Sequence, residues 1–306
     1  MFVAKRPAWR RIEWGTALLL LSNLGLWLAT VLHADQLPTF LVFLLGGFTL
    51  CLHGSLQHEC VHGHPTPWRW LNTLLAWTPV TLWIPYRVYR ASHLAHHQSP
   101  SLTHPQLDSE SFYFERGRWE QLPAWRRWLE QINTALLGRM LVGPWMVWAS
   151  MWADSLARIR AGESGLLTEW MLHFAGCAGV LWVASVGGLS PAEYMVLMVW
   201  PGIALTLQRS YGEHHPGEDQ DRCTAIVETG PLLSLLYLNN NLHSVHHAFP
   251  GLAWYRVPGA YFADRERWLH RNGNRLFRGY SDLWRRHAFS SRSAVYPLDE
   301  RPDNAR

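Results

Sequence analysis

The sequence is poor in lysine and has no paired cysteines. Lys5 is the only lysine among 306 residues, so arginine carries almost all of the positive charge, and the net charge is +4. The arginines form no basic run interleaved with aromatic residues, which argues against nucleic-acid binding. The four cysteines, Cys51, Cys60, Cys177 and Cys223, show no paired spacing. This argues against a disulfide framework and fits a reducing compartment.

Long apolar runs are what the sequence does contain. A helix needs about 20 mostly apolar residues to cross a bilayer, and four segments come close: residues 14–32, 39–57, 166–186 and 192–208. The first follows a basic start, as in a signal peptide, but its apolar run is too long for one, so we predict a retained span. The 19 tryptophans are typical of membrane–water interfaces. The sequence therefore predicts an all-α membrane protein with four transmembrane helices.

The basic residues are distributed asymmetrically about these spans. Of the 27 lysines and arginines, four precede Trp14, ten lie between Val61 and Gly165, and thirteen follow Gln208. The two short links between spans, residues 33–38 and 187–191, contain none. With four spans, every basic residue lies on one side, which the positive-inside rule makes cytoplasmic. We therefore predict a multi-pass protein with both termini in the cytoplasm.

Two further apolar stretches, residues 68–85 and 133–152, complicate the count of spans. A single span at residues 68–85 would put His62 and His93 on opposite faces of the membrane. Both stretches contain proline, and we predict that they are interfacial or re-entrant helices at the cytoplasmic face. We interpret residues 1–290 as one membrane domain with a cytoplasmic cap that holds the histidine clusters, and residues 291–306 as a loosely ordered tail.

Eight of the 17 histidines fall in three regularly spaced clusters. The first cluster spaces two histidines four residues apart, and the other two repeat the spacing i, i+3, i+4. The clusters are His58/His62, His93/His96/His97 and His243/His246/His247. On a helix, residues three and four apart share a face. We therefore expect each cluster to point its imidazoles at one place, on the cytoplasmic side of the spans.

Imidazoles in this pattern predict a metal site. Gathering eight of them at a membrane surface would be costly without a metal ion to bind. Zinc takes four ligands in total, so eight nitrogens exceed the need of one zinc ion and imply two metal ions. Imidazole suits iron, copper and zinc alike.

Two alternatives use the same histidines differently. Residues 58–62 read His-Glu-Cys-Val-His and match the HExxH motif of zinc metalloproteases, some of which are intramembrane. That interpretation leaves both HxxHH clusters unexplained. The other alternative is a non-catalytic membrane carrier or sensor of metal ions, which the regular HxxHH spacing disfavours.

Two further elements extend the pattern. Residues 209–214 read Arg-Ser-Tyr-Gly-Glu-His, and residues 239–258 run from Asn-Asn-Asn-Leu-His through the third cluster to Pro258. Together with the three clusters and the four-span layout, they resemble the membrane fatty acid desaturase and hydroxylase superfamily in its short bacterial form. The resemblance covers residues 45–265. The first cluster is HxxxH and not HxxxxH, so it looks less like the acyl-CoA Δ9 desaturases.

The resemblance implies a di-iron centre bound almost wholly by histidine, with His214 as a ninth ligand. It also implies O2 as co-substrate, an external electron donor of ferredoxin or rubredoxin type, and the bacterial inner membrane as location. The expected reaction is desaturation of a long-chain fatty acyl or lipid substrate. Hydroxylases, ketolases and oxidative fatty-acid decarboxylases of the superfamily share the same clusters, which do not separate these reactions.

Carboxylates near the clusters are candidates to orient the ligand rings. They are Glu59, Asp108, Glu213, Asp219 and Asp221. Glu213 is the strongest candidate because it directly precedes His214. Glu213 and Glu59 are also the candidate catalytic residues.

Several polar residues outside the clusters have more than one candidate role. Asn239, Asn240 and Asn241 are expected to cap a helix or to bind a metal-bound water, and capping is the simpler role. His173 lies inside the third predicted span, with Glu169 one turn away as a candidate partner. The sequence leaves the roles of His53 and His64 open.

Overall fold

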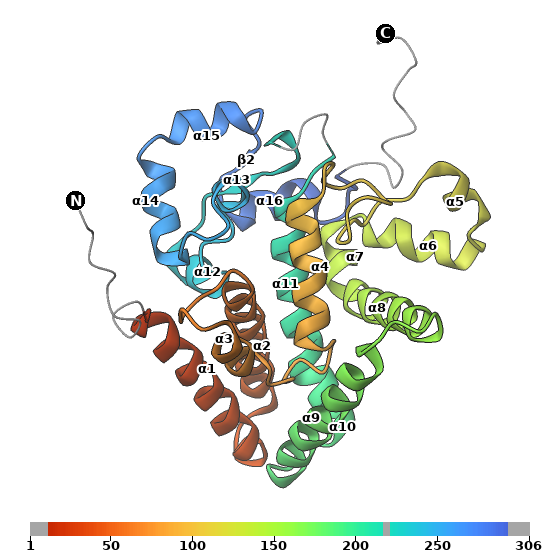
Figure 1. The fold of residues 1–306 in the computed structure, drawn as a ribbon, viewed down its shortest axis with the longest axis vertical. Helices are drawn as coiled ribbons and strands as arrows, with labels where there is room; N and C mark the ends of the chain where they lie inside the picture. Colours follow the sequence, from red (N-terminus) through yellow and green to blue (C-terminus); the bar gives the residue numbers. More distant parts are fainter. Residues whose placement is uncertain (1–11, 217–220, 293–306) are drawn as a thin grey trace. The chain divides into compact units, whose positions relative to one another are not determined.

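The computed structural model of the protein describes residues 12–216 and 221–292 (Figure 1). This part of the chain is mostly helical, as predicted. It forms two compact units. Unit 1 contains the residues up to Arg90 and Met151–Ile203, and unit 2 contains Ala91–Ser150 and the residues from Ala204 onward. The single domain over residues 1–290 stays a prediction, and residues 293–306 of the predicted tail lie outside the described residues.

Unit 1 contains the long apolar helices. Three helices in the described chain are long and apolar enough to cross a membrane: α1 (Trp14–Leu32), α2 (Thr39–Val61) and α9 (Leu166–Val186). The bounds of α1 and α9 coincide with the predicted spans, whereas α2 continues past residue 57 to include His58 and ends just before His62, its C-cap. The short η2 (Ala34–Gln36) joins α1 to α2. Only 22% of the apolar window of α9 is buried in the protein, so most of its apolar side chains face outward, as expected for contact with lipid.

The fourth predicted span is built from three consecutive helical segments. They are α10 (Pro191–Tyr194), the π-helical η3 (Met195–Val199) and α11 (Trp200–Glu213). This stretch is not among the three helices above. It packs closely on α2, because a Cβ on Gly46 would lie 2.7 Å from Met198 Cγ, and one on Gly202 would lie 2.6 Å from Leu50 Cβ. Glycine at these two positions permits the close approach.

The stretch predicted as a helix over residues 68–85 is helical only in α3 (Arg69–Ala76). Residues 77–85 have no regular structure before α4 (Tyr86–Gln98) begins. Pro79 and Pro85 cannot donate helical hydrogen bonds, and Leu82 adopts a left-handed conformation with φ of 51°. These residues explain why the helix stops, so the predicted extent of this helix is wrong.

Side chains from the neighbouring helices bind the carbonyl groups in and just before this irregular segment. The pairs are His53 Nε2–Thr78 O at 3.0 Å, Gln57 Nε2–Ala76 O at 2.8 Å, Tyr194 Oη–Val80 O at 2.6 Å and Trp152 Nε1–Trp83 O at 3.1 Å. Non-helical backbone at membrane depth is tolerated only where the protein satisfies its polar groups. The four bonds satisfy four carbonyl groups in this way and give His53 a structural role.

The Tyr194→Phe variant is expected to lower the free energy of unfolding by about 1–2 kcal/mol. Tyr194 is fully buried, and its hydroxyl donates to Val80 O while accepting from Trp27 Nε1 at 3.0 Å. The variant removes both bonds inside the protein. Thermal unfolding in detergent measures the loss. Tyr255→Phe, at a residue that is 45% exposed, is the control, and equal losses in the two variants would contradict the prediction.

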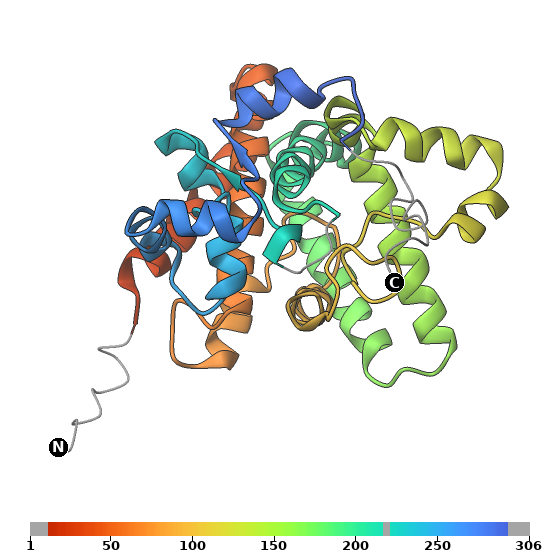
Figure 2. The ribbon, with the colours of Figure 1, turned by 90° about the horizontal axis from the view of Figure 1, so that it is seen from above.

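Unit 2 contains many short helices and a small parallel sheet (Figure 2). Strand β1 (Ile226–Val227) pairs with β2 (Leu276–Phe277). The short helices are α5 (Arg116–Gln121), α6 (Ala124–Asn133), α7 (Leu136–Leu141), α12 (Pro231–Leu236), α13 (His243–Ala248), α14 (Val257–Phe262), α15 (Arg265–Arg271) and α16 (Tyr280–His287). Two 3-10 turns, η4 (Asp221–Cys223) and η5 (Trp254–Arg256), join them. Ile226, Val245 and Tyr261 are fully buried in one apolar cluster, which anchors α13.

The second predicted interfacial helix, over residues 133–152, is divided in the structure. Helix α7 ends at Leu141, and α8 (Gly143–Arg160) begins two residues later. Pro144 is the second residue of α8, where a missing N–H costs nothing and the fixed φ favours the first turn. The predicted bounds of this helix are therefore wrong, and α8 continues eight residues past them. Helices α4, α8 and α11 each have residues in both units.

Candidate metal centre

Unit 2 holds seven of the nine predicted ligand histidines. Helix α4 carries His93, His96 and His97 on residues that belong to unit 2, and α13 carries His243, His246 and His247. His214 directly follows α11, where its backbone pairs with Thr224 in an isolated antiparallel bridge. The prediction that both HxxHH clusters lie on helices is confirmed.

The histidines of unit 2 form two groups. The four-histidine group contains His96, His214, His243 and His247, whose ligand nitrogens all lie within 4.8 Å of one another. The three-histidine group contains His93, His97 and His246. Each HxxHH cluster therefore divides its histidines between both groups, and the expectation that a cluster points at one place is wrong.

Helix geometry explains this division. At 3.6 residues per turn, residue i+4 lies about 40° from residue i around the helix axis. Residue i+3 lies about 60° from residue i in the opposite direction, and so about 100° from residue i+4. On α4 the i, i+4 pair is His93 and His97, and His96 points to the other group. On α13 the pair is His243 and His247, and His246 points to the other group.

Distances within the groups suit metal coordination. His214 Nε2 lies 3.1 Å from His96 Nε2 and 2.9 Å from His243 Nε2. In the three-histidine group, His97 Nε2 lies 3.1 Å from His93 Nε2 and 3.0 Å from His246 Nε2. Neighbouring ligands around one ion have similar spacing, because metal–imidazole bonds are about 2.0–2.1 Å long. Each group could hold one metal ion.

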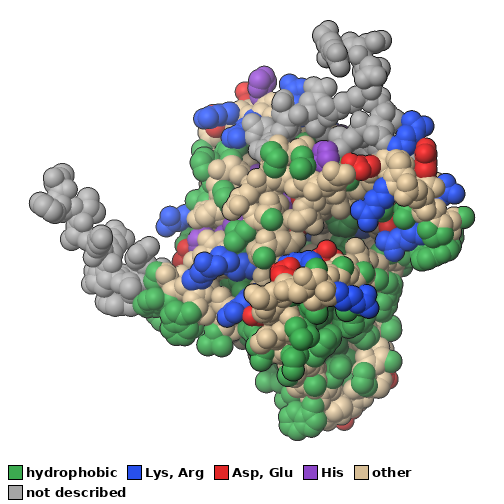
Figure 3. All heavy atoms as spheres, turned by 45° about the vertical axis from the view of Figure 1, so that its right-hand side comes forward, with side chains coloured by type: hydrophobic (Ala, Val, Ile, Leu, Met, Phe, Trp, Pro, Cys, Tyr) green, Lys and Arg blue, Asp and Glu red, His purple; other side chains and the backbone are tan. Residues whose placement is uncertain are grey.

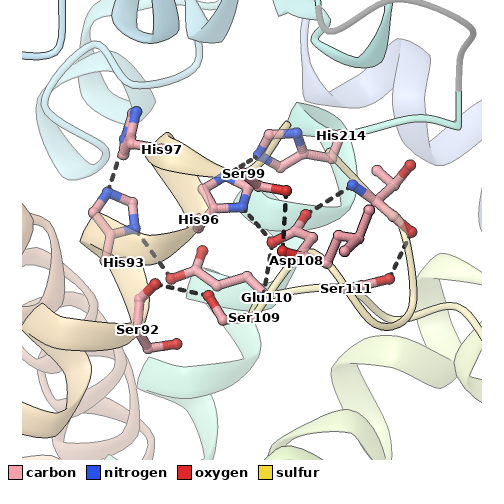
Figure 4. Close-up of polar contacts among 12 residues, drawn as sticks. Ser92, His93, His96, His97, Ser99, Asp108, Ser109, Glu110, Ser111 and His214 are labelled. Carbon is pink, nitrogen blue, oxygen red and sulfur yellow. Dashed lines mark hydrogen bonds and ion pairs between the residues drawn. The ribbon is translucent and has the colours of Figure 1, made fainter. Parts of the chain in front are cut away.

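Two carboxylates bind the Nδ1 atoms of two histidines of α4, while the Nε2 atoms of these rings face the two groups (Figure 4). Asp108 Oδ1 lies 2.7 Å from His96 Nδ1, and Glu110 Oε1 lies 3.1 Å from His93 Nδ1. An ionised carboxylate only accepts hydrogen bonds, so each Nδ1 carries the proton and each Nε2 keeps its lone pair for the group. Asp108 was among the predicted orienting residues. Glu110 was missed, although it lies only two residues beyond Asp108 in the same loop.

Asp108 is itself held by the backbone. Its Oδ2 accepts from the N–H of Thr103 at 2.7 Å, and its Oδ1 accepts from the N–H of Glu110 at 2.9 Å. Its side chain is 2% exposed, against 32% for Glu110. Burial alone would raise the pKa of Glu110, but the hydrogen-bonded His93 holds that pKa well below its ordinary value. Asp108 is the more rigidly positioned of the two.

Glu213 lies behind the third cluster. Its Oε1 is 2.9 Å from Arg209 Nε and 3.5 Å from His243 Nδ1, and it accepts from Asn240 Nδ2 at 2.8 Å. Burial raises the pKa of Glu213 to about 7, although Arg209 acts in the opposite direction. Glu213 therefore contacts a predicted ligand histidine on the side away from the four-histidine group, as expected of an orienting residue, and it can take up a proton near neutral pH.

The other two asparagines of the run bind backbone. Asn239 Nδ2 donates to Trp254 O at 3.0 Å, and Asn241 Nδ2 donates to Val227 O at 2.7 Å. The N-cap of α13 is Leu242, without a side-chain cap bond. The simpler role predicted for the asparagines, capping of this helix, is therefore wrong, because their amides join the start of α13 to β1 and η5 instead.

The first cluster lies in unit 1 at the end of α2. The His58 and His62 rings have centroids 4.8 Å apart, and His58 is buried. Glu59 Oε1 is 4.0 Å from His58 Nδ1, too far for a hydrogen bond. His64 Nδ1 lies 2.9 Å from Glu13 Oε1, a contact that explains its position outside the cluster.

Three further predictions have mixed outcomes. Glu169, the candidate partner of His173, pairs instead with Arg87 at 2.9 Å. Asp219 lies outside the described residues, and Asp221 begins η4. The catalytic roles of Glu213 and Glu59 stay predictions.

An imidazole must be neutral to bind a metal ion, and several histidines of unit 2 meet this condition. Burial, reinforced by neighbouring imidazoles, holds the pKa of His214, His243 and His247 well below the ordinary value, and lowers the pKa of His97 to about 3. His247 Nε2 is buried and has no hydrogen-bond partner within the described structure. Such an atom is costly to bury alone, and a metal ion would satisfy it.

Lowering the pH from 7.5 to 5.5 is expected to destabilise the metal-free protein. Four of the predicted ligand histidines have a folded pKa below the unfolded value of about 6.5, so the unfolded state binds more protons below that pH. Stability is then lost as the pH falls below about 6.5, down to the folded pKa. His96 acts in the opposite direction: burial would lower its pKa, but its hydrogen bond to Asp108 raises it.

Thermal unfolding of chelator-treated protein at the two pH values measures this effect. The metal-loaded protein is the control, because a bound ion keeps its ligands deprotonated and should reduce the loss. A metal-free protein that is equally stable at pH 5.5 would contradict the assignment of these histidines as buried and neutral.

Comparison with known proteins agrees with this site. A search of curated protein sequences found no match. The family model for fatty acid desaturases matches residues 34–277, a region that includes all three histidine clusters and His214. That match extends over most of the chain, and the chain belongs to the fatty acid desaturase family.

Proposed function

We propose that this protein is a membrane enzyme that uses O2 to desaturate a long-chain fatty acyl or lipid substrate at a di-iron centre. Family membership makes it an oxidoreductase acting on fatty acids. The observation that carries the finer proposal is the division of seven buried or half-buried histidines of unit 2 into two groups, each backed by a carboxylate. Two groups of nitrogen ligands call for two ions.

The ligand set that we propose contains nine histidines. The four-histidine group holds one ion, and the three-histidine group binds the other. We assign His58 and His62 to the second ion, on the grounds of their regular spacing and of the resemblance given by the sequence. Imidazole ligands suit iron, copper and zinc, and we choose iron because the family resemblance implies it.

The chemistry needs a metal because no amino-acid side chain can break an unactivated C–H bond; iron with O2 supplies that oxidant. Desaturation removes two protons and two electrons from the substrate. O2 takes four electrons and four protons to become two waters, so two electrons and two protons come from elsewhere. We propose an external ferredoxin- or rubredoxin-type donor for the electrons.

The protein residues would orient the ligands and handle protons. Asp108 and Glu110 would fix the rings of His96 and His93, so that the Nε2 atoms face the ions. Glu213 is our candidate to hold a proton, since its pKa is about 7 and it contacts His243. Glu59, which is buried next to His58, is the second candidate.

The membrane arrangement that we propose has four crossings. Helices α1 and α9 and residues 39–57 of α2 provide three of them, and residues 192–208 of the segment α10–η3–α11 provide the fourth. The charge asymmetry of the sequence supports a cytoplasmic location for the termini and the three histidine clusters, in a bacterial inner membrane.

Other reactions of the same superfamily are the main alternatives. Hydroxylation, ketolation and oxidative decarboxylation would use the same histidines and differ only in the fate of the oxidised substrate. The zinc protease interpretation uses His58, Glu59 and His62 with one or two further ligands. It finds no support in the family match, and it leaves both groups of unit 2 without a role.

Metal analysis combined with lipid profiling tests the proposal. The purified protein is expected to contain about two iron ions per chain, and cells that express it should gain lipid double bonds that His246→Ala cells lack. New hydroxyl or keto groups, or terminal alkenes, would identify one of the alternatives. One zinc ion with proteolytic activity, or unchanged lipids with ferredoxin and rubredoxin donors supplied, would overturn the proposal.

A further inference from the structure

Helix α6 exposes aromatic side chains and buries polar ones, the reverse of a surface helix in a water-soluble protein. Trp125 is 63% exposed and Trp128 is 61% exposed. They are three residues apart and share one face of the helix. Glu130 and Asn133 are the buried residues of α6. A pair of exposed tryptophans on one face is typical of a surface that contacts another phase or molecule.

Polar contacts hold this orientation. Glu130 Oε1 lies 2.7 Å from Arg126 Nη2, and Asn133 Nδ2 donates to Glu130 Oε2 at 3.5 Å. The buried Arg139 of α7 donates from Nε to Asn133 O at 2.9 Å. Turning the tryptophans inward would break these contacts, because it would expose the groups that make them. The aromatic face therefore stays outward in the folded unit 2.

The charge around α6 favours an anionic partner. Residues 116–133 contain four arginines and two glutamates, a net charge of +2. Arg118 on α5 is exposed. Arginine beside tryptophan is the combination found in helices that lie on membranes with anionic lipids, where the ring sits at headgroup level and the cation meets phosphate. Figure 3 shows hydrophobic and arginine side chains close together on one face of the molecule.

Helix α3 of unit 1 repeats the same inverted pattern. Trp70 is 67% exposed and Leu74 is 62% exposed, whereas Asn72 is buried and bound to Thr66. Helix α3 directly follows α2, one of the three helices that can cross a membrane. The chain thus contains a second helix with exposed apolar and buried polar side chains, and that helix follows one that can cross a membrane. This favours a bilayer, and not another soluble protein, as the partner of such a face.

We propose that α6 is an interfacial helix that binds the surface of a bilayer containing anionic lipid. The rings of Trp125 and Trp128 lie at headgroup level, and the arginines of residues 116–127 contact lipid phosphates. This binding needs no metal ion and is independent of the reaction that the histidines perform.

Site-directed labelling of the full chain tests the proposal. All four native cysteines are buried, so a thiol-reactive fluorophore attaches selectively to a new cysteine. Trp128→Cys is labelled after reconstitution into phosphatidylcholine vesicles with and without phosphatidylglycerol. Glu266→Cys, on the exposed surface of α15, is the control. Quenching by iodide reports contact with water, and quenching by lipids with a nitroxide near the headgroup reports contact with the bilayer.

The expected result is that iodide quenches the label at position 128 about threefold less than the label at position 266, as for an interfacial site. The nitroxide lipid should quench position 128 only, and phosphatidylglycerol should strengthen this difference. Trp125→Cys gives a second, independent readout if the first variant unfolds. Iodide quenching equal to that of the control would overturn the proposal. Protection from both quenchers would also overturn it, and would indicate a protein partner or a second copy on this face.

Discussion

The His247→Ala variant should lose product formation by more than about 100-fold and retain one iron ion per chain or fewer. His247 belongs to the four-histidine group, and its buried Nε2 has no hydrogen-bond partner in the described structure. Alanine removes a ligand nitrogen that no nearby residue can replace, since the other three members already contribute one ring each. Activity on membrane lipid and metal content by mass spectrometry are the two measurements.

His270→Ala is the matched control for this variant. His270 lies exposed on α15, outside both groups, so its loss should leave metal content and activity unchanged. Thermal unfolding separates a local effect from global unfolding. A His247→Ala protein with full metal content and activity would remove His247 from the ligand set.

The Asp108→Asn variant is expected to lower metal affinity or activity by about 10–100-fold, the usual cost of removing a hydrogen-bond partner of a ligand histidine. Asp108 accepts three hydrogen bonds, from His96 and from two backbone N–H groups. The amide of asparagine has one accepting oxygen and one NH2 group, so its NH2 must face a donor. Either His96 loses its acceptor or the loop that positions residue 108 shifts.

Comparison with Glu110→Gln makes the Asp108 test specific. Glu110 is more exposed, and its contact with His93 is longer, so its variant should lose less. Glu120→Gln, at a side chain that is 64% exposed, controls for the loss of a negative charge. Competition with a chelator measures metal affinity directly. Equal effects of Asp108→Asn and Glu120→Gln would show that the buried contact to His96 does not matter.

Several features of the fold were predictable because they depend on local patterns. The bounds of α1 and α9 follow from uninterrupted apolar runs, and the HxxHH spacing requires helices at α4 and α13. Asp108 could be named because it lies in the loop that follows the second cluster. The sequence also predicted His214, through its resemblance to a family element.

Features that depend on contacts between distant segments could not be predicted. The loop that returns Glu110 to His93 has no sequence signature, since any carboxylate in that loop could fill the role. The amide of Asn240 binds Glu213 across 27 residues, so its role was mistaken for a local cap. The irregular residues 77–85 depend on bonds from three different helices, which no periodicity reveals.

The division of each HxxHH cluster between two groups has a consequence for how the protein acquires its metal. Helices α4 and α13 each contribute rings to both groups, so an ion bound in one group fixes the orientation of the helices that also carry ligands for the other. Binding of the first ion therefore includes the loss of conformational entropy of both helices. The second ion then binds rings that are already ordered. Metal loading should be cooperative, with chains that hold a single ion rare at every stage of a titration.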